Sequence, residues 1–172
     1  MGARILSEAT QLPTDLTDKQ GHPFRVRLFD PATDRAKLER MYDSFQPKRA
    51  AQGLPPETEY AQRRWLDHIL KTGSHLLVEV NTEVWGHAML IPMSEKGSTE
   101  LAIFLHQLIR GRGIGTAMNR LLVELARADG FQRVWLSVEP SNIPAIRSYQ
   151  KAGFLTLRYS MYASEIEMEV RL

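Results

Sequence analysis

Apolar residues recur along the chain with two periods, and the change of period separates strands from helices. Alternating apolar and polar positions predict strands, whereas a spacing of three or four residues predicts amphipathic helices. The helices are expected at residues 33–45 and 57–71, with a third that ends at Gly130 and a fourth that ends at Gly153. The strands are expected at residues 24–29, 75–80, 84–91, 100–106, 133–138, 154–163 and 165–172.

This order of elements, β-α-α-β-β-β-α-β-α-β-β, predicts a single-domain α/β (α+β) fold. A helix joins the fourth and fifth strands, so these two strands should be parallel. The remaining connections favour antiparallel pairs, which gives one mixed sheet of about seven strands covered by helices. Residues 1–22 show little periodicity and are expected to form a loose N-terminal arm, while residues 23–172 form the domain.

Composition narrows the class of protein. The chain has 172 residues, 43% of them hydrophobic, with a net charge of +2. The small net charge gives no reason to expect a nucleic-acid or membrane partner, and no apolar run is long enough to span a bilayer. The chain contains no cysteine, which excludes thiolate nucleophiles and thiolate metal ligands. Because the N-terminal residues are polar and carry no signal-peptide pattern, a cytoplasmic protein is expected.

A glycine-rich loop lies between an apolar run at residues 101–105 and the third helical pattern. A strand, a turn and a helix start in this order direct unpaired N–H groups and the positive end of a helix dipole at one point, which favours phosphate. Glycine lets the phosphate approach the main chain closely, and arginine adds positive charge. The loop consists of Arg110, Gly111, Arg112, Gly113, Ile114, Gly115 and Thr116.

Several interpretations of this loop compete. A dinucleotide-binding fingerprint requires glycine where Thr116 stands, and a P-loop requires a lysine that the loop lacks. A third pattern, R-G-x-G-x-G, is typical of acyl-CoA enzymes and fits the loop. A glycine turn that merely starts a helix is the remaining alternative.

A second motif favours the acyl-CoA interpretation. The pattern N-x-x-A-x-x-x-Y-x-x-x-G-F is matched by Asn142, Ala145, Tyr149, Gly153 and Phe154. With Arg110, Gly113 and Gly115 in the pattern Q/R-x-x-G-x-G/A, the chain resembles the GNAT superfamily of acetyl-CoA-dependent N-acetyltransferases. The motifs that carry the resemblance extend over residues 100–154.

The resemblance implies a site and a cofactor. Acetyl-CoA is the expected co-substrate, with its pyrophosphate at residues 110–116 and its pantetheine arm in a gap where the fourth and fifth strands splay apart. It further implies main-chain contacts from Ile103, Phe104 and Leu105, a side-chain contact from Asn142, and Tyr149 as the general acid near the sulfur.

The general base is less well defined by sequence. Glu100 begins the fourth strand, where some family members carry a catalytic glutamate, but its spacing to the loop is one residue short. Glu139 and His106 are alternatives, Ser137 stands where other members carry glutamate, and a water chain to solvent would also suffice. The histidines show no spacing typical of a metal site, so no metal is expected.

The predicted function is transfer of an acetyl group from acetyl-CoA to a primary amine, by direct attack within a ternary complex. The alternative is a non-catalytic acyl-CoA-binding sensor of the same fold. The acceptor, a small molecule or a protein amine, is expected between the loop around Lys48 and the final hairpin. A homodimer paired through the last strand is a further option.

Overall fold

The computed structural model describes residues 11–48, 55–157 and 164–172. Within these ranges, eight strands form one sheet in the order β1-β2-β3-β4-β5-β6-β8-β7. The strands are β1 (Thr14–Thr17), β2 (Pro23–Leu28), β3 (Ser74–Val80), β4 (Glu83–Pro92), β5 (Ser98–Leu105), β6 (Arg133–Val138), β7 (Leu155–Thr156) and β8 (Ile166–Arg171). The helices are α1 (Arg35–Asp43), α2 (Glu59–Ile69), α3 (Ile114–Ala128) and α4 (Ile143–Lys151), with a 3-10 turn, η1 (Gln107–Ile109).

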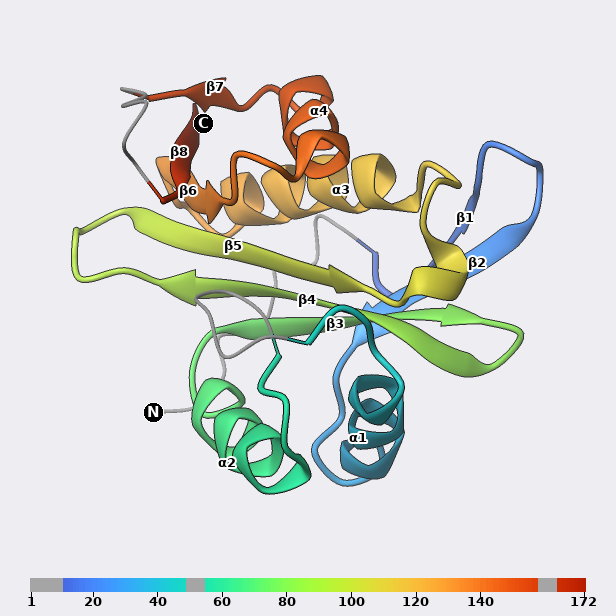
Figure 1. The fold of residues 1–172 in the computed structure, drawn as a ribbon. Helices are drawn as coiled ribbons and strands as arrows, with labels where there is room; N and C mark the ends of the chain where they lie inside the picture. Colours follow the sequence, from blue (N-terminus) through green and yellow to red (C-terminus); the bar gives the residue numbers. More distant parts are fainter. Residues whose placement is uncertain (1–10, 49–54, 158–163) are drawn as a thin grey trace.

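The sheet separates two helical layers. Helices α1 and α2 cover one face, and α3 and α4 cover the other (Figure 1). Each layer closes its own apolar core, one including Met118 and Leu122 of α3, the other including Tyr42 of α1 and Leu66 of α2. The alternating strand patterns supply both cores, because successive side chains point to opposite faces. None of the helices in the described ranges is long and apolar enough to cross a membrane.

The sheet opens between β5 and β6. These strands run parallel but pair only where Ser98–Glu100 faces Arg133–Trp135. Beyond this point β5 continues to pair with β4, and β6 continues to pair with β8. The mixed α/β fold and its splayed fourth and fifth predicted strands are therefore confirmed, and the central strands end on either side of a gap.

The N-terminal segment differs from the prediction. Residues 14–17 form β1, which pairs antiparallel with β2, so the expectation of a loose arm is wrong for this stretch. Only Leu16 of this short strand packs against the core. A strand with one apolar residue shows no recognisable alternation of apolar and polar positions, so the sequence did not predict it. Residues 1–10 of the predicted arm, 49–54 of the predicted loop and 158–163 of the predicted sixth strand lie outside the described residues.

Candidate active site

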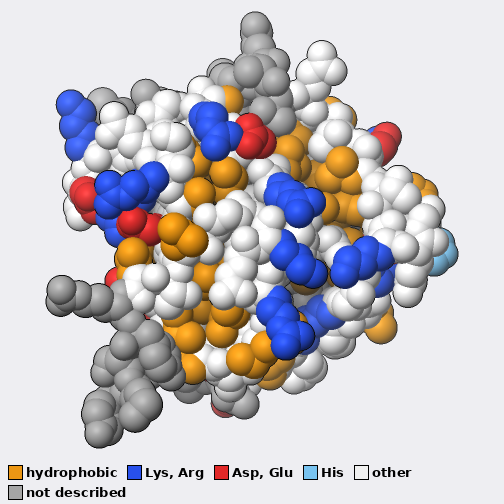
Figure 2. Space-filling view, turned by 90° about the horizontal axis from the view of Figure 1, so that it is seen from above, with side chains coloured by type: hydrophobic (Ala, Val, Ile, Leu, Met, Phe, Trp, Pro, Cys, Tyr) orange, Lys and Arg blue, Asp and Glu red, His pale blue; other side chains and the backbone are white. Residues whose placement is uncertain are grey.

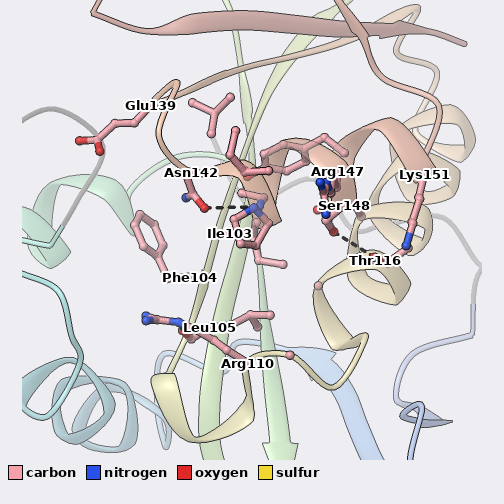
Figure 3. Close-up of a pocket in the computed structure, with 18 of the residues that line it drawn as sticks. Ile103, Phe104, Leu105, Arg110, Thr116, Glu139, Asn142, Arg147, Ser148 and Lys151 are labelled. Atoms are coloured by element: carbon pink, nitrogen blue, oxygen red, sulfur yellow. Dashed lines mark hydrogen bonds between the residues drawn. The ribbon is translucent and has the colours of Figure 1, made fainter.

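A cleft of about 910 Å³ lies where β5, α3, α4 and the end of β6 meet. Its walls come from segments that are distant in sequence, including the glycine loop, the first turn of α3 and one side of α4 (Figure 3). Most of the predicted site residues line it: Ile103, Phe104, Leu105, Arg110, Gly111, Gly113, Gly115, Thr116, Asn142 and Tyr149. Glu100, Arg112 and Ile114 are not among the lining residues.

The glycine loop presents unpaired main-chain donors. Gly111 and Gly113 have φ values of +75° and +82°, a left-handed conformation that turns the chain sharply into α3. Gly113 is the N-cap of α3, where no side chain caps the helix and the first turn carries no acidic residue. In the described ranges, the amides of residues 111–116 have no hydrogen-bond acceptor. The loop can therefore direct several N–H groups and the positive helix end toward an anion.

Close packing holds this loop against the neighbouring elements. A Cβ at Gly115 would lie 3.4 Å from Leu105 Cδ1 and 3.5 Å from Ser148 Oγ, so any side chain there would narrow the cleft. The hydroxyl oxygens of Ser148 on α4 and of Thr116 lie 3.1 Å apart (Figure 3). The Ser148 hydroxyl also accepts from Asn119 Nδ2 at 3.0 Å. These bonds join the first two turns of α3 to α4.

Both arginines of the loop serve as braces. Arg110 donates from Nε to the Leu105 carbonyl at 2.8 Å, and its guanidinium lies 5.0 Å from the centre of the Phe45 ring. Arg112 donates from Nε to Asp18 Oδ2 at 2.6 Å, on the turn between β1 and β2. The structure thus directs the Arg112 guanidinium to a carboxylate, and its main-chain amide remains open to a phosphate. Ile114 is buried in the core and contributes its amide alone.

The gap between β5 and β6 exposes main-chain groups of β5. The amide of His106, which follows β5, donates to the Trp85 carbonyl of β4 at 2.8 Å. Because main-chain groups alternate along a strand, those of Phe104 also face β4, whereas those of Ile103 and Leu105 face the gap. The Leu105 carbonyl accepts from Arg110. Within the described ranges, the main-chain groups of Ile103 and the Leu105 amide are therefore open to an extended ligand. Phe104 contributes its side chain to the cleft wall.

Asn142 directly precedes α4, and Tyr149 lies within it. The Asn142 side chain caps the helix, accepting from the Ala145 amide at 3.3 Å (Figure 3). Among the residues that the structure describes, its Nδ2 group has no partner and is open to a ligand. Tyr149 is buried, its ring centre lies 5.8 Å from that of Phe154, and burial raises the pKa of its hydroxyl to about 12. The hydroxyl therefore stays protonated at neutral pH and can act as a proton donor.

The candidate general bases differ in burial and in their position relative to the cleft. Glu100 is half-buried, and burial together with the nearby Glu165 charge raises the pKa of its carboxyl. Glu165 and Glu139 line the cleft, although Figure 3 shows the Glu139 carboxylate turned away from the other labelled side chains. His106 is buried, with Nε2 3.1 Å from Ser44 Oγ and a pKa lowered by burial. The sequence did not indicate Glu165 as a cleft residue, because it lies outside both motifs. It reaches the cleft because it directly precedes β8, which pairs with β6.

Three cations of the cleft also escaped sequence analysis. Lys19 comes from the turn between β1 and β2, and Arg147 and Lys151 come from α4. Figure 2, seen from the side of α3 and α4, shows Lys and Arg side chains gathered in a band over this face. A polyanionic ligand would find favourable charge along it.

The fold and the cleft agree with the comparisons with known proteins, which show the family. The model of the acetyltransferase (GNAT) family matches residues 38–154, so this chain belongs to that family. The GNAT domain of S. lividans PAT has a similar fold, with a TM-score of 0.76 at 20% identity, covering 93% of this chain and 97% of that one.

Two further relatives extend the comparison. An acetyltransferase of Bacillus subtilis solved in complex with CoA has a TM-score of 0.65 at 16% identity, covering 87% of this chain and 99% of that one. A mycothiol acetyltransferase of Corynebacterium glutamicum is 47% identical over 45 residues, which are 26% of this chain and 15% of that protein. The shared stretch is thus a small part of the curated relative, and it carries no conclusion about the acceptor.

Proposed function

We propose that this acetyltransferase moves an acetyl group from acetyl-CoA to a primary amine by direct attack within a ternary complex. The observation that carries the proposal is the meeting, in one cleft, of the unpaired amides of residues 111–116 and the free main-chain edge of β5. One feature suits a diphosphate and the other suits an arm that contains amides. Acetyl-CoA combines both groups in one molecule, and its thioester supplies the activated acyl carbon.

In this reaction, a main-chain amide of β5 and the Tyr149 hydroxyl assist the transfer. A main-chain N–H of β5 in the gap polarises the thioester carbonyl, which stabilises the negative charge that develops on its oxygen. The amine nitrogen bonds to the carbonyl carbon, the carbon–sulfur bond breaks, and the amine loses one proton. Tyr149 donates its phenolic proton to the departing sulfur and regains a proton from solvent.

The acceptor end of the cleft favours a cationic amine. Ser137 and Glu139 lie at the end of β6, and Glu165 lies just before β8, which pairs with β6. Carboxylates attract the ammonium form of an amine and hydrogen-bond to it. Before attack, the ammonium gives one proton to one of these carboxylates or to water, which frees the nitrogen lone pair. The proton that the nitrogen loses after it bonds to carbon passes to water. Glu100 fits this set as a neighbour of Glu165 rather than as a group in the cleft.

Calorimetric titration with acetyl-CoA, followed by a free-thiol assay with a panel of primary amines, tests the proposal. We expect micromolar to submillimolar binding and release of CoA that depends on the amine. The protein should bind desulfo-CoA without turnover, which serves as the control for binding. Absence of binding at millimolar acetyl-CoA would overturn the proposal. Tight binding without thiol release for any amine would favour the non-catalytic sensor.

A further inference from the structure

The turn between β1 and β2 is fastened to the glycine loop at two points. The Lys19 amide donates to the Arg112 carbonyl at 2.9 Å, and Arg112 Nε donates to Asp18 Oδ2 at 2.6 Å. The turn itself is rigid, because Asp18 Oδ1 accepts from the amides of Gln20 and His22 at 2.8 and 2.9 Å. Asp18 is only 7% exposed although it carries a charge. The position of residue 19 relative to the loop is therefore well fixed.

The Lys19 side chain extends over the start of α3. A Cβ at Gly113 would lie 2.7 Å from Lys19 Cγ and 2.9 Å from Lys19 Cε, so the aliphatic stem covers this glycine. The ammonium follows Cε by one bond and is thus held close to the open amides. In the part of the chain that the structure describes, it forms no ion pair. Lys19 also lines the same cleft as Gly111, Gly113 and Gly115.

Both arginines of the glycine loop already have partners, unlike Lys19. The Arg112 guanidinium binds Asp18, and the Arg110 guanidinium binds main-chain carbonyls of Leu105 and Gln46. Neither arginine can turn to an anion without breaking those bonds, whereas the Lys19 ammonium can bind one at once. Asp18 and Arg112 are then positioning residues, which place the lysine through the main chain.

We propose that Lys19 binds the phosphate groups of the acyl-CoA, through a charge-assisted hydrogen bond from its ammonium. The charge comes from a turn that lies before the first predicted strand and outside the residues matched by the family model. This inference rests on the proposed function, because it names a binding residue for the same cofactor. The Lys19 contact would add a binding residue to the cofactor site, held in place by the turn that follows strand β1.

Calorimetric titration of four proteins with CoA and with pantetheine, which lacks the phosphates, tests the inference. We expect Lys19→Ala to weaken CoA binding five- to tenfold and to leave the much weaker pantetheine binding within twofold. Lys19→Arg should stay within twofold of the wild type for both ligands. Lys96→Ala is the matched control, because it removes an exposed lysine that does not line the cleft and should change neither affinity.

Salt dependence separates a charge contact from a packing effect. The CoA affinity of the wild type should fall more steeply with rising salt than that of Lys19→Ala, because salt screens the exposed ammonium. An affinity of Lys19→Ala within twofold of the wild type would overturn the inference while leaving the proposed function intact. An equal loss for CoA and pantetheine would also overturn it. A wild type that binds no CoA would overturn both proposals.

Discussion

Tyr149 carries the proton-transfer step at the scale of a single residue. Its hydroxyl lies in a mostly apolar environment, and burial raises its pKa to about 12. Such a group loses none of its donor capacity between pH 7 and 10, although it is a weaker acid than a free phenol. Apolar surroundings thus favour the protonated form that the reaction needs.

Substituting Tyr149→Phe should therefore lower kcat about 10²-fold, within the range expected for loss of a general acid. Acetyl-CoA affinity should stay within twofold, because the ring and its packing on Phe154 remain. Steady-state kinetics combined with titration measure both quantities. A matched loss of binding and kcat would indicate a structural role for the hydroxyl, and an unchanged kcat would remove Tyr149 from the mechanism.

Gly113 is a second position where one residue decides the local geometry. Its φ of +82° is strained for any residue with a Cβ, and an added Cβ would also meet Lys19. Gly113→Ala should lower the free energy of unfolding by about 1 kcal/mol or more and weaken CoA binding about tenfold, because the loop amides shift. Urea unfolding and calorimetric titration are the measurements.

The opposite end of the same helix offers a matched control. Gly130 has a φ of +80° with open space around its Cβ position, and it lies outside the cleft. Gly130→Ala should show a similar loss of stability with unchanged CoA affinity. Equal effects of the two substitutions on affinity would contradict a specific role for the loop conformation.

At the scale of elements, strand β1 and its turn act as a brace for the glycine loop. Burial of the Asp18 carboxyl acts to raise its pKa, but hydrogen bonds from the His22 amide and from Arg112 outweigh this and lower the pKa to about 2. A carboxyl with a lowered folded-state pKa stabilises the protein above the unfolded pKa near 4. This contribution disappears as the pH falls toward 2.

Asp18→Asn should therefore lower the thermal unfolding midpoint at pH 7 and weaken CoA binding severalfold. The difference in midpoint from the wild type should shrink as the pH falls from 4 toward 2. Asp15→Asn is the control on the same element, because the Asp15–Arg25 pair is exposed and such pairs contribute little. Scanning calorimetry across pH measures the midpoints. Equal effects of both substitutions would contradict the brace.

The elements that sequence could predict are those with local signals. The glycine loop and the Asn142 cap of α4 are encoded by neighbouring residues, so their places in the chain follow from spacing alone. Lys19 and Glu165 reach the cleft only because β1 pairs with β2 and β8 pairs with β6. Such pairings join segments that are distant in sequence. The short strand β1 also has too few apolar residues to be predicted as a strand. The fold was therefore more predictable than the full set of cleft residues.

At the scale of the whole molecule, a chain of buried polar groups runs from α1 over one face of the sheet, from β4 to β3. Tyr42 lies 2.8 Å from His87 Nδ1, His87 Nε2 lies 3.0 Å from His75 Nδ1, and His75 Nε2 lies 2.9 Å from the Thr72 carbonyl. The carbonyl can only accept, so His75 Nε2 donates to it, and His75 Nδ1 accepts from His87 Nε2. His87 Nδ1 then accepts from the Tyr42 hydroxyl. All three bonds form with both imidazoles neutral, whereas protonation of both rings would set the N–H of His75 Nδ1 against that of His87 Nε2, 3.0 Å apart.

This arrangement predicts that acid weakens the fold near pH 6. Burial lowers the pKa of His75, and burial together with the neighbouring His75 lowers the pKa of His87 well below its ordinary value. Below pH 6.5 the unfolded chain therefore binds protons that the folded chain does not. The free energy of unfolding should fall with decreasing pH by up to about 1.4 kcal/mol per pH unit for each such histidine.

Urea unfolding between pH 8 and pH 5 measures this slope. His87→Gln should lower stability at pH 8 but flatten the decline below pH 6.5, because one titrating group is gone and the hydroxyl of Tyr42 can still find an amide oxygen. His68→Gln removes an exposed histidine of α2 and should keep the wild-type slope. A wild-type stability that stays constant from pH 7.5 to pH 5.5 would mean that these rings accept protons in the folded state. The assignment of neutral rings to this hydrogen-bonded chain would then be wrong.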